Sequence, residues 1–72
     1  MTMKLTQALT GQEYIVRDIC TDDEEMDAFL FSLGCYSGAS ITVVQRGKHN
    51  CVVSIKDGRY NIDNQLAEAI VV

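Results

Sequence analysis

The sequence of residues 40–62 is SITVVQRGKHNCVVSIKDGRYNI. Its β-branched and apolar residues gather in three short runs of the kind found in β-strands, over residues 40–46, 51–56 and 59–62. A polar turn separates the first two runs, and Asp57-Gly58, a strong two-residue hairpin signal, separates the last two. This stretch therefore predicts three consecutive antiparallel strands joined by tight turns.

A helix is predicted just before these strands, over residues 22–33. Its apolar residues recur at the spacing of one helical face, namely Met26, Phe29, Leu30 and Leu33. Thr21 and Glu24 have the spacing of a capping box, in which each side chain accepts a hydrogen bond from the other's backbone. Gly34 follows where a helix commonly ends in a left-handed residue, so the helix should have about three turns.

The other apolar runs complete a mainly β fold. Residues 14–19 predict a first strand and residues 70–72 a last one, and Asp63-Asn64 can cap a helical turn before the last strand. Five strands, with one α-helix inserted between the first and second, indicate a small barrel or sandwich. Residues 1–72 form a single domain, because a chain this short cannot enclose two cores. The expected core is Ile15, Leu30, Leu33, Ile41, Val43, Val53, Ile55, Ile62 and Ile70.

The charge balance argues against nucleic acid and anionic membrane surfaces as partners. The formal net charge is −4, with six basic residues scattered among ten acidic ones, whereas phosphate binding needs clustered Lys and Arg. No apolar run approaches the roughly 20 residues that span a bilayer, so no membrane insertion is expected. The first residues lack the apolar core of a signal peptide, so a cytoplasmic location is expected.

The sequence offers no set of residues for catalysis. His49 is the single histidine, and two residues from Cys51 it has no third group to orient it as a base. Glycine-rich phosphate loops precede a helix, whereas the glycines at 34 and 38 follow one. We therefore expect a protein that is not an enzyme.

No tightly bound cofactor or metal is expected either. Cys20, Cys35 and Cys51 are odd in number and widely spaced, which favours reduced, mostly buried thiols over a disulfide set. Cys35, His49 and Cys51 do not have the spacing of a structural zinc site. Weak, non-specific metal contact at Asp22, Asp23 and Glu25 is an alternative to their simpler role of stabilising the helix start.

One pattern of residues resembles a known family. Leu33-Gly34, Gly38 and then Ile41, Val43 and Val44 form the pattern LGxxxGxxIxVV. This resembles the ferrous iron transport protein A family, whose members are small SH3-like barrels. Similar openings and endings extend the resemblance over almost the whole chain, at Leu5, Leu9, Gly11 and residues 14–16, and at Leu66, Ala67 and residues 69–72.

The resemblance implies a five-stranded SH3-like barrel and a partner. That partner is the membrane ferrous iron transporter that carries a cytoplasmic GTPase domain, with this chain as its accessory protein. Two alternatives stay open: a free-standing metal-responsive module like the SH3-like domain of iron-dependent repressors, and weak homo-oligomerisation through an open strand edge. Family members often carry basic residues in the helix, where this chain is acidic, so its partner contacts can differ.

Two segments are candidates for the partner surface. Tyr36 lies on a glycine-flanked loop, where a tyrosine is not needed for the turn and offers a broad contact face. The turn after the second strand carries Arg46, Lys48 and His49, a local basic cluster suited to an acidic patch. An alternative for Tyr36 is that it closes the end of the barrel. Leu33, Gly34 and Gly38 are expected to be structural.

Overall fold

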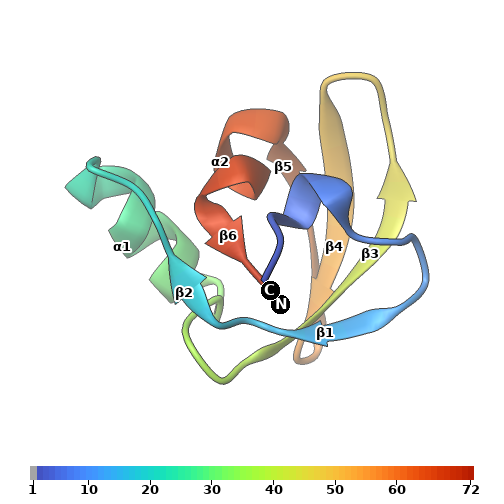
Figure 1. The fold of residues 1–72 in the computed structure, drawn as a ribbon, viewed down its shortest axis with the longest axis horizontal. Helices are drawn as coiled ribbons and strands as arrows, with labels where there is room; N and C mark the ends of the chain where they lie inside the picture. The colour runs from blue at the N-terminus through green and yellow to red at the C-terminus, as the bar shows by residue number, and fades with distance from the viewer. Residues whose placement is uncertain (1) are drawn as a thin grey trace.

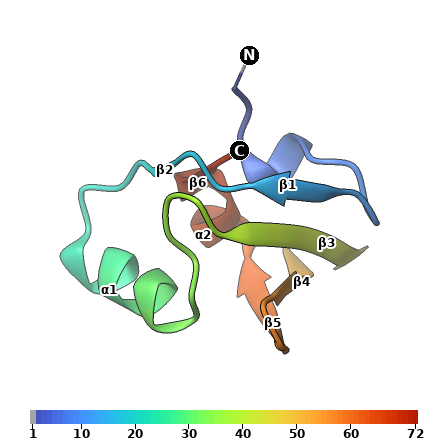
Figure 2. The ribbon, with the colours of Figure 1, turned by 90° about the horizontal axis from the view of Figure 1, so that it is seen from below.

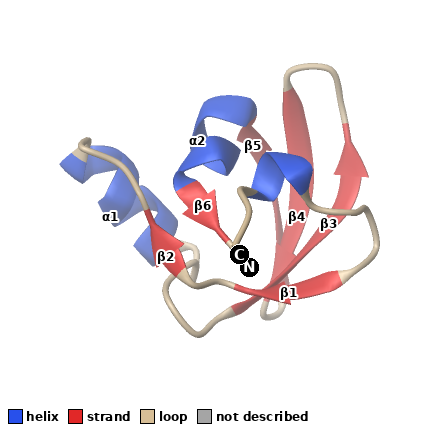
Figure 3. Cartoon of the chain, in the orientation of Figure 1, coloured by secondary structure: helices blue, strands red, loops and turns tan. Residues whose placement is uncertain are grey.

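The computed structural model describes residues 2–72 and is mainly β (Figures 1 and 3). Its elements, in chain order, are a 3-10 turn η1 (Leu5–Gln7), β1 (Glu13–Ile15), β2 (Asp18–Ile19), α1 (Glu24–Ser32), β3 (Ser40–Arg46), β4 (Asn50–Ile55), β5 (Gly58–Asp63), α2 (Asn64–Ala69) and β6 (Ile70–Val71). The prediction of a mainly β fold with a helix after the first strand is confirmed.

The strands form two sheets that share one bent segment. One sheet has the order β1-β3-β4-β5, and the other pairs β2 with β6. The predicted strand over residues 14–19 divides where the chain changes partner: Val16 N–H donates to Ala39 at 2.8 Å, and Arg17 N–H donates to Val71 at 2.7 Å. Because β1 and β2 are one continuous segment, the six strands correspond to the five that the sequence predicts.

The core lies between these sheets and the helical elements η1, α1 and α2, each of which contributes a buried side chain. Its fully buried side chains are Leu5, Val16, Leu30, Ile41, Val43, Val53, Ile55, Ile62, Ile70 and the two cysteines Cys35 and Cys51. The expectation that Ile15 is buried is wrong, because that side chain is 53% exposed. Val16, just after β1, points inward, and Tyr14 on β1 packs partly against the core, so Ile15 between them must point outward.

Helix α1 starts two residues later than the capping box predicts. Its N-cap is Asp23, whose carboxylate accepts from the backbone N–H of Glu25 at 2.9 Å and of Met26 at 3.3 Å. Thr21 instead accepts from Asp23 N–H at 3.1 Å, so the expected Thr21–Glu24 box is wrong. A charged carboxylate closer to the free N–H groups is the stronger acceptor.

The C-terminal end of α1 matches the prediction at Gly34, which has φ +88°. Gly34 N–H donates to Phe31 at 3.0 Å and Cys35 N–H to Leu30 at 2.9 Å, the two bonds of a Schellman motif. Figures 1 and 2 show α1 at one side of the molecule, away from the four-stranded sheet. Leu30 is its one fully buried side chain, while Leu33 and Met26 are half-buried and Phe29 is exposed.

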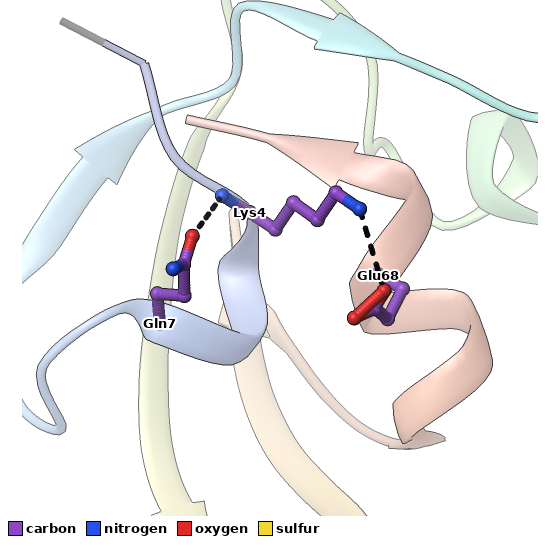
Figure 4. Close-up of polar contacts among 3 residues, drawn as sticks. All are labelled: Lys4, Gln7 and Glu68. Atoms are coloured by element: carbon purple, nitrogen blue, oxygen red, sulfur yellow. Dashed lines mark hydrogen bonds and ion pairs between the residues drawn. The ribbon is translucent and has the colours of Figure 1, made fainter.

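The chain ends meet beside α2. Met3 and Val72 exchange two backbone hydrogen bonds, of 3.0 and 2.8 Å. Lys4 extends this contact in Figure 4: its Nζ lies 3.5 Å from Oε2 of Glu68 on α2, and its backbone N–H donates to Gln7 Oε1 at 3.2 Å. Both charged side chains are more than half exposed, so this ion pair adds little to stability.

Candidate partner-binding surface

The structure separates the two predicted contact segments. The loop between α1 and β3, which carries Tyr36, lies at the lower left of Figure 1, whereas the turn between β3 and β4 lies at the upper right. Ser40 at the near end of β3 pairs with Ile15, and Arg46 at the far end pairs with Cys51. Tyr36 and the basic turn therefore form two surfaces rather than one.

Arg46 is turned toward the molecule itself. Its Nη2 donates to the carbonyl of Leu5 at 3.2 Å and to that of Ala8 at 2.9 Å, which ties η1 to the hairpin. A register shift between Val43 and Gln45 explains this direction, because the extra residue moves position 46 to the side of buried Cys51. Arg46 thus has structural partners that the sequence pattern did not reveal.

Lys48 and His49 are exposed at the tip of the same turn. The backbone of the tip is held by α2: Asn64 N–H donates to the His49 carbonyl at 2.9 Å, and the Asn64 side chain donates to the Lys48 carbonyl at 3.5 Å. The fold therefore fixes the turn while leaving both basic side chains in solvent.

Tyr36 lies in a small cluster with Phe31 and Lys56. The rings of Tyr36 and Phe31 are 5.3 Å apart at an angle of 40°, and the Lys56 ammonium donates to the Tyr36 hydroxyl and lies 4.7 Å from the ring centre. Tyr36 is half-buried, while Phe31 is 66% exposed. The cluster presents an aromatic face next to a lysine ammonium. Aromatic side chains are enriched at protein interfaces, and a cation beside the ring is attracted to its face.

Sequence reasoning missed Lys56 because it placed the β4–β5 turn one residue too late. Ile55 pairs directly with Gly58, so the turn residues are Lys56 and Asp57 rather than Asp57 and Gly58. Lys56 has φ +54°, a left-handed conformation that is uncommon for a lysine. Since Ile55 also pairs with Ile41 at the start of β3, this turn lies next to the Tyr36 loop.

The glycines of the Leu33-Gly34…Gly38 motif shape that loop. A Cβ on Gly34 would lie 3.4 Å from the Lys56 side chain, so this glycine both ends α1 and lets the lysine stem approach. Gly38 has φ +95°, and its N–H donates to Val16 at 2.8 Å. The loop is thereby fastened to the corner between β1 and β2.

The buried cysteines are held as neutral thiols. Burial raises the pKa of Cys35 to about 11, and burial also raises the pKa of Cys51, an effect partly offset by the charge of Arg46. A metal or an electrophile reacts with the thiolate, so both groups are poorly suited to that chemistry. Within residues 2–72 no three His, Cys, Asp or Glu side chains are placed to share a metal ion.

A thiol-specific reagent should therefore distinguish the three cysteines. In the native protein at neutral pH, 5,5′-dithiobis(2-nitrobenzoate) should modify one thiol per chain rapidly, at exposed Cys20. The other two should react only as the protein unfolds, and three should react in guanidinium chloride. Rapid modification of the Cys20→Ser variant would contradict this arrangement.

The two small sheets of short strands, with short helices between them, have the architecture of a small SH3-like domain. The FeoA domain model matches residues 3–72. The chain belongs to the FeoA domain family.

Solved structures agree with this assignment. A crystal structure described as the iron uptake regulatory protein FeoA is 26% identical, with a TM-score of 0.89, covering 100% of this chain and 96% of its own. A manganese-dependent transcriptional repressor is 22% identical with a TM-score of 0.90, over 99% of this chain and 40% of the repressor. FeoA from Stenotrophomonas maltophilia, complexed with zinc and described as an SH3 domain protein, is 16% identical with a TM-score of 0.84, over 94% and 86% of the two chains.

These likenesses confirm the SH3-like fold that the sequence resemblance implied. A search of curated protein sequences finds no match. Neither α1 nor α2 has the length and apolar character that a membrane-crossing helix requires, and the same holds for every helix in residues 2–72.

Proposed function

We propose that this chain is a cytoplasmic, non-enzymatic accessory protein of ferrous iron uptake that acts by contact with the GTPase-containing membrane transporter. The observation that carries the proposal is the FeoA domain match over residues 3–72, joined to a whole-chain likeness to an iron uptake regulatory protein. The two clusters support a role in contact, because each presents at least one exposed basic side chain on a turn, Lys56 in one and Lys48 and His49 in the other.

The test measures binding to the soluble GTPase domain of the transporter from the same genome. The GTPase domain is immobilised, and the untagged chain is applied at increasing concentration. We expect saturable binding that Lys48→Glu or Lys56→Glu weakens about tenfold, since each variant places a like charge against an acidic partner patch. Arg59→Glu makes the same charge change on exposed β5 and serves as the matched control.

Each variant is also melted, because a lost contact must be separated from a damaged fold. Weakened binding with an unchanged melting temperature in one of the two lysine variants identifies the contact cluster. Tyr36→Ala then tests whether the aromatic ring takes part, and a lowered melting temperature would assign Tyr36 to the barrel instead. Absence of binding by the unaltered chain, in the presence and absence of GTP, would contradict the proposal.

The second candidate is a free-standing metal-responsive regulatory module. The likeness to the manganese-dependent repressor favours it only at the level of fold, over 40% of that protein. Equilibrium dialysis against Fe(II) and Mn(II) separates the two candidates, since a sensor needs a stoichiometric site and an adapter does not. One tightly held ion per chain would favour the sensor.

A further inference from the structure

Within residues 2–72, strand β1 has an edge that no other strand covers. It pairs with β3 on one side, with Tyr14 opposite Ile41, and two residues later Val16 N–H donates to Ala39. In an antiparallel pair, alternate residues direct both backbone groups to the partner strand. Tyr14 and Val16 therefore face β3, and the N–H and C=O groups of Glu13 and Ile15 face the open side.

A groove of about 670 Å³ lies along this open side. Its wall opposite β1 is made by residues near the two chain ends, Thr2, Met3 and Val72. Its lining is Thr2, Met3, Glu13, Tyr14, Ile15, Arg17 and Val72, and most of the lining surface is apolar. The volume lies within the range of about 300–1,000 Å³ typical of ligand clefts.

The groove lies beyond the C-terminal end of β6, in the direction in which that strand runs. Next to the free edge, Arg17 already uses its N–H on Val71 and its carbonyl on the Ser37 hydroxyl, at 2.7 and 3.0 Å. A strand placed beyond Val72 in the direction of β6 would run antiparallel to β1, since β2 and β6 are antiparallel. It would meet Ile15 first and Glu13 second, with free backbone groups on both.

A second copy of the chain does not suit this position. Two-fold pairing centred on Ile15 would place the partner strand opposite Arg17, where Val71 and Val72 already lie. Two-fold pairing centred on Glu13 would set two carboxylates opposite each other, which is destabilising. Two-fold pairing centred on Tyr14 would set the Glu13 carboxylate opposite the apolar Ile15 of the other copy and give it no opposite charge. A strand of different sequence, with a basic residue opposite Glu13, suits the edge better.

We propose that the β1 edge binds an extended peptide segment of another protein, which adds as an antiparallel strand in line with β6. Charge and exposure specify the segment: an apolar residue opposite Ile15, which is 53% exposed, and a basic residue opposite Glu13, which is also exposed. The residue between them turns toward Met3, Tyr14 and Val72. Backbone hydrogen bonds supply affinity in this mode of recognition, and alternate side chains supply specificity. The binding site on β1 is the same whichever protein supplies the strand.

The test uses the untagged chain and the peptide acetyl-Thr-Val-Val-Lys-Thr-amide. Two N-methylated forms are compared, one methylated at the second and fourth residues, whose N–H groups face β1, and one methylated at the third, whose N–H faces away. We expect the unmodified and third-residue peptides to bind and to shift the amide resonances of Glu13–Arg17, Met3 and Val72. Methylation at the two facing nitrogens should weaken binding about tenfold or more, because two hydrogen bonds are lost.

Two further variants make the test specific. Glu13→Lys should lose affinity for the lysine peptide and gain it for the same peptide with Glu in the fourth position. Equal binding of the two methylated peptides would overturn strand addition, and so would no binding of the unmodified peptide at millimolar concentration. A concentration-dependent dimer abolished by Ile15→Asp would assign the edge to a second copy instead. None of these readouts involves the transporter, so this inference and the proposed function fail separately.

Discussion

Ile41→Ala is expected to lower the free energy of unfolding by about 2–5 kcal/mol. Ile41 is fully buried on the central strand β3, opposite Tyr14 on β1 and Ile55 on β4. Truncation removes apolar contacts on both sides and leaves a cavity that the paired strands cannot close. The melting temperature should fall by roughly 10 °C or more, because each kcal/mol corresponds to about 4–8 °C in a domain of this size.

Ile15→Ala is the matched control, since it deletes the same atoms from the neighbouring strand. Because the Ile15 side chain is exposed, its truncation should lower the free energy of unfolding by less than about 0.5 kcal/mol. Urea unfolding followed by circular dichroism measures both variants. Comparable losses would mean that the inward and outward faces of β1 and β3 are wrongly assigned.

Arg46→Met is expected to destabilise the protein by roughly 1.5–3 kcal/mol, although it changes a residue at a hairpin end. The guanidinium holds the Leu5 and Ala8 carbonyls, and Leu5 is fully buried beneath them. Methionine keeps the apolar stem but cannot donate, so both carbonyls lose a charged partner. Arg46→Lys should recover only part of the stability, because an ammonium lacks the planar geometry of a guanidinium.

Lys48→Met removes the same charge from the same hairpin and should leave the unfolding curve within about 0.5 kcal/mol of the unaltered protein. Its side chain is exposed and only its carbonyl is held, by Asn64. An equal loss in both variants would show that net charge, rather than the contact of Arg46 with η1, causes the effect.

The strands and helices were predictable because their signals are local. Alternation and turn residues place β3, β4 and β5, and Asp63 caps α2 at the expected position, accepting from Leu66 N–H at 2.8 Å. The inward face of β1 was not predictable from its own sequence. Tyr14, Ile15 and Val16 are all apolar, so their alternation carries no information on which residue points to the core.

The surfaces were harder to predict because they depend on register between distant residues. Tyr36 could be singled out as an unusual loop residue, but its neighbour Lys56 follows from the pairing of Ile55 with both Ile41 and Gly58. The sequence predicted Arg46 as part of a basic cluster. In the structure the register shift between Val43 and Gln45 directs its side chain toward η1. In both cases a displacement of one residue changes which side chain is available for contact.

The pairing of Met3 with Val72 also bears on how this domain can be joined to other chains. Ends that lie side by side allow circular permutation, and they allow a domain to be inserted into a surface loop of another protein with little distortion. The same closeness has a practical side, because both ends border the groove along β1. A purification tag or fusion partner at either end would crowd that groove, whereas a label on exposed Cys20 would leave both ends unmodified.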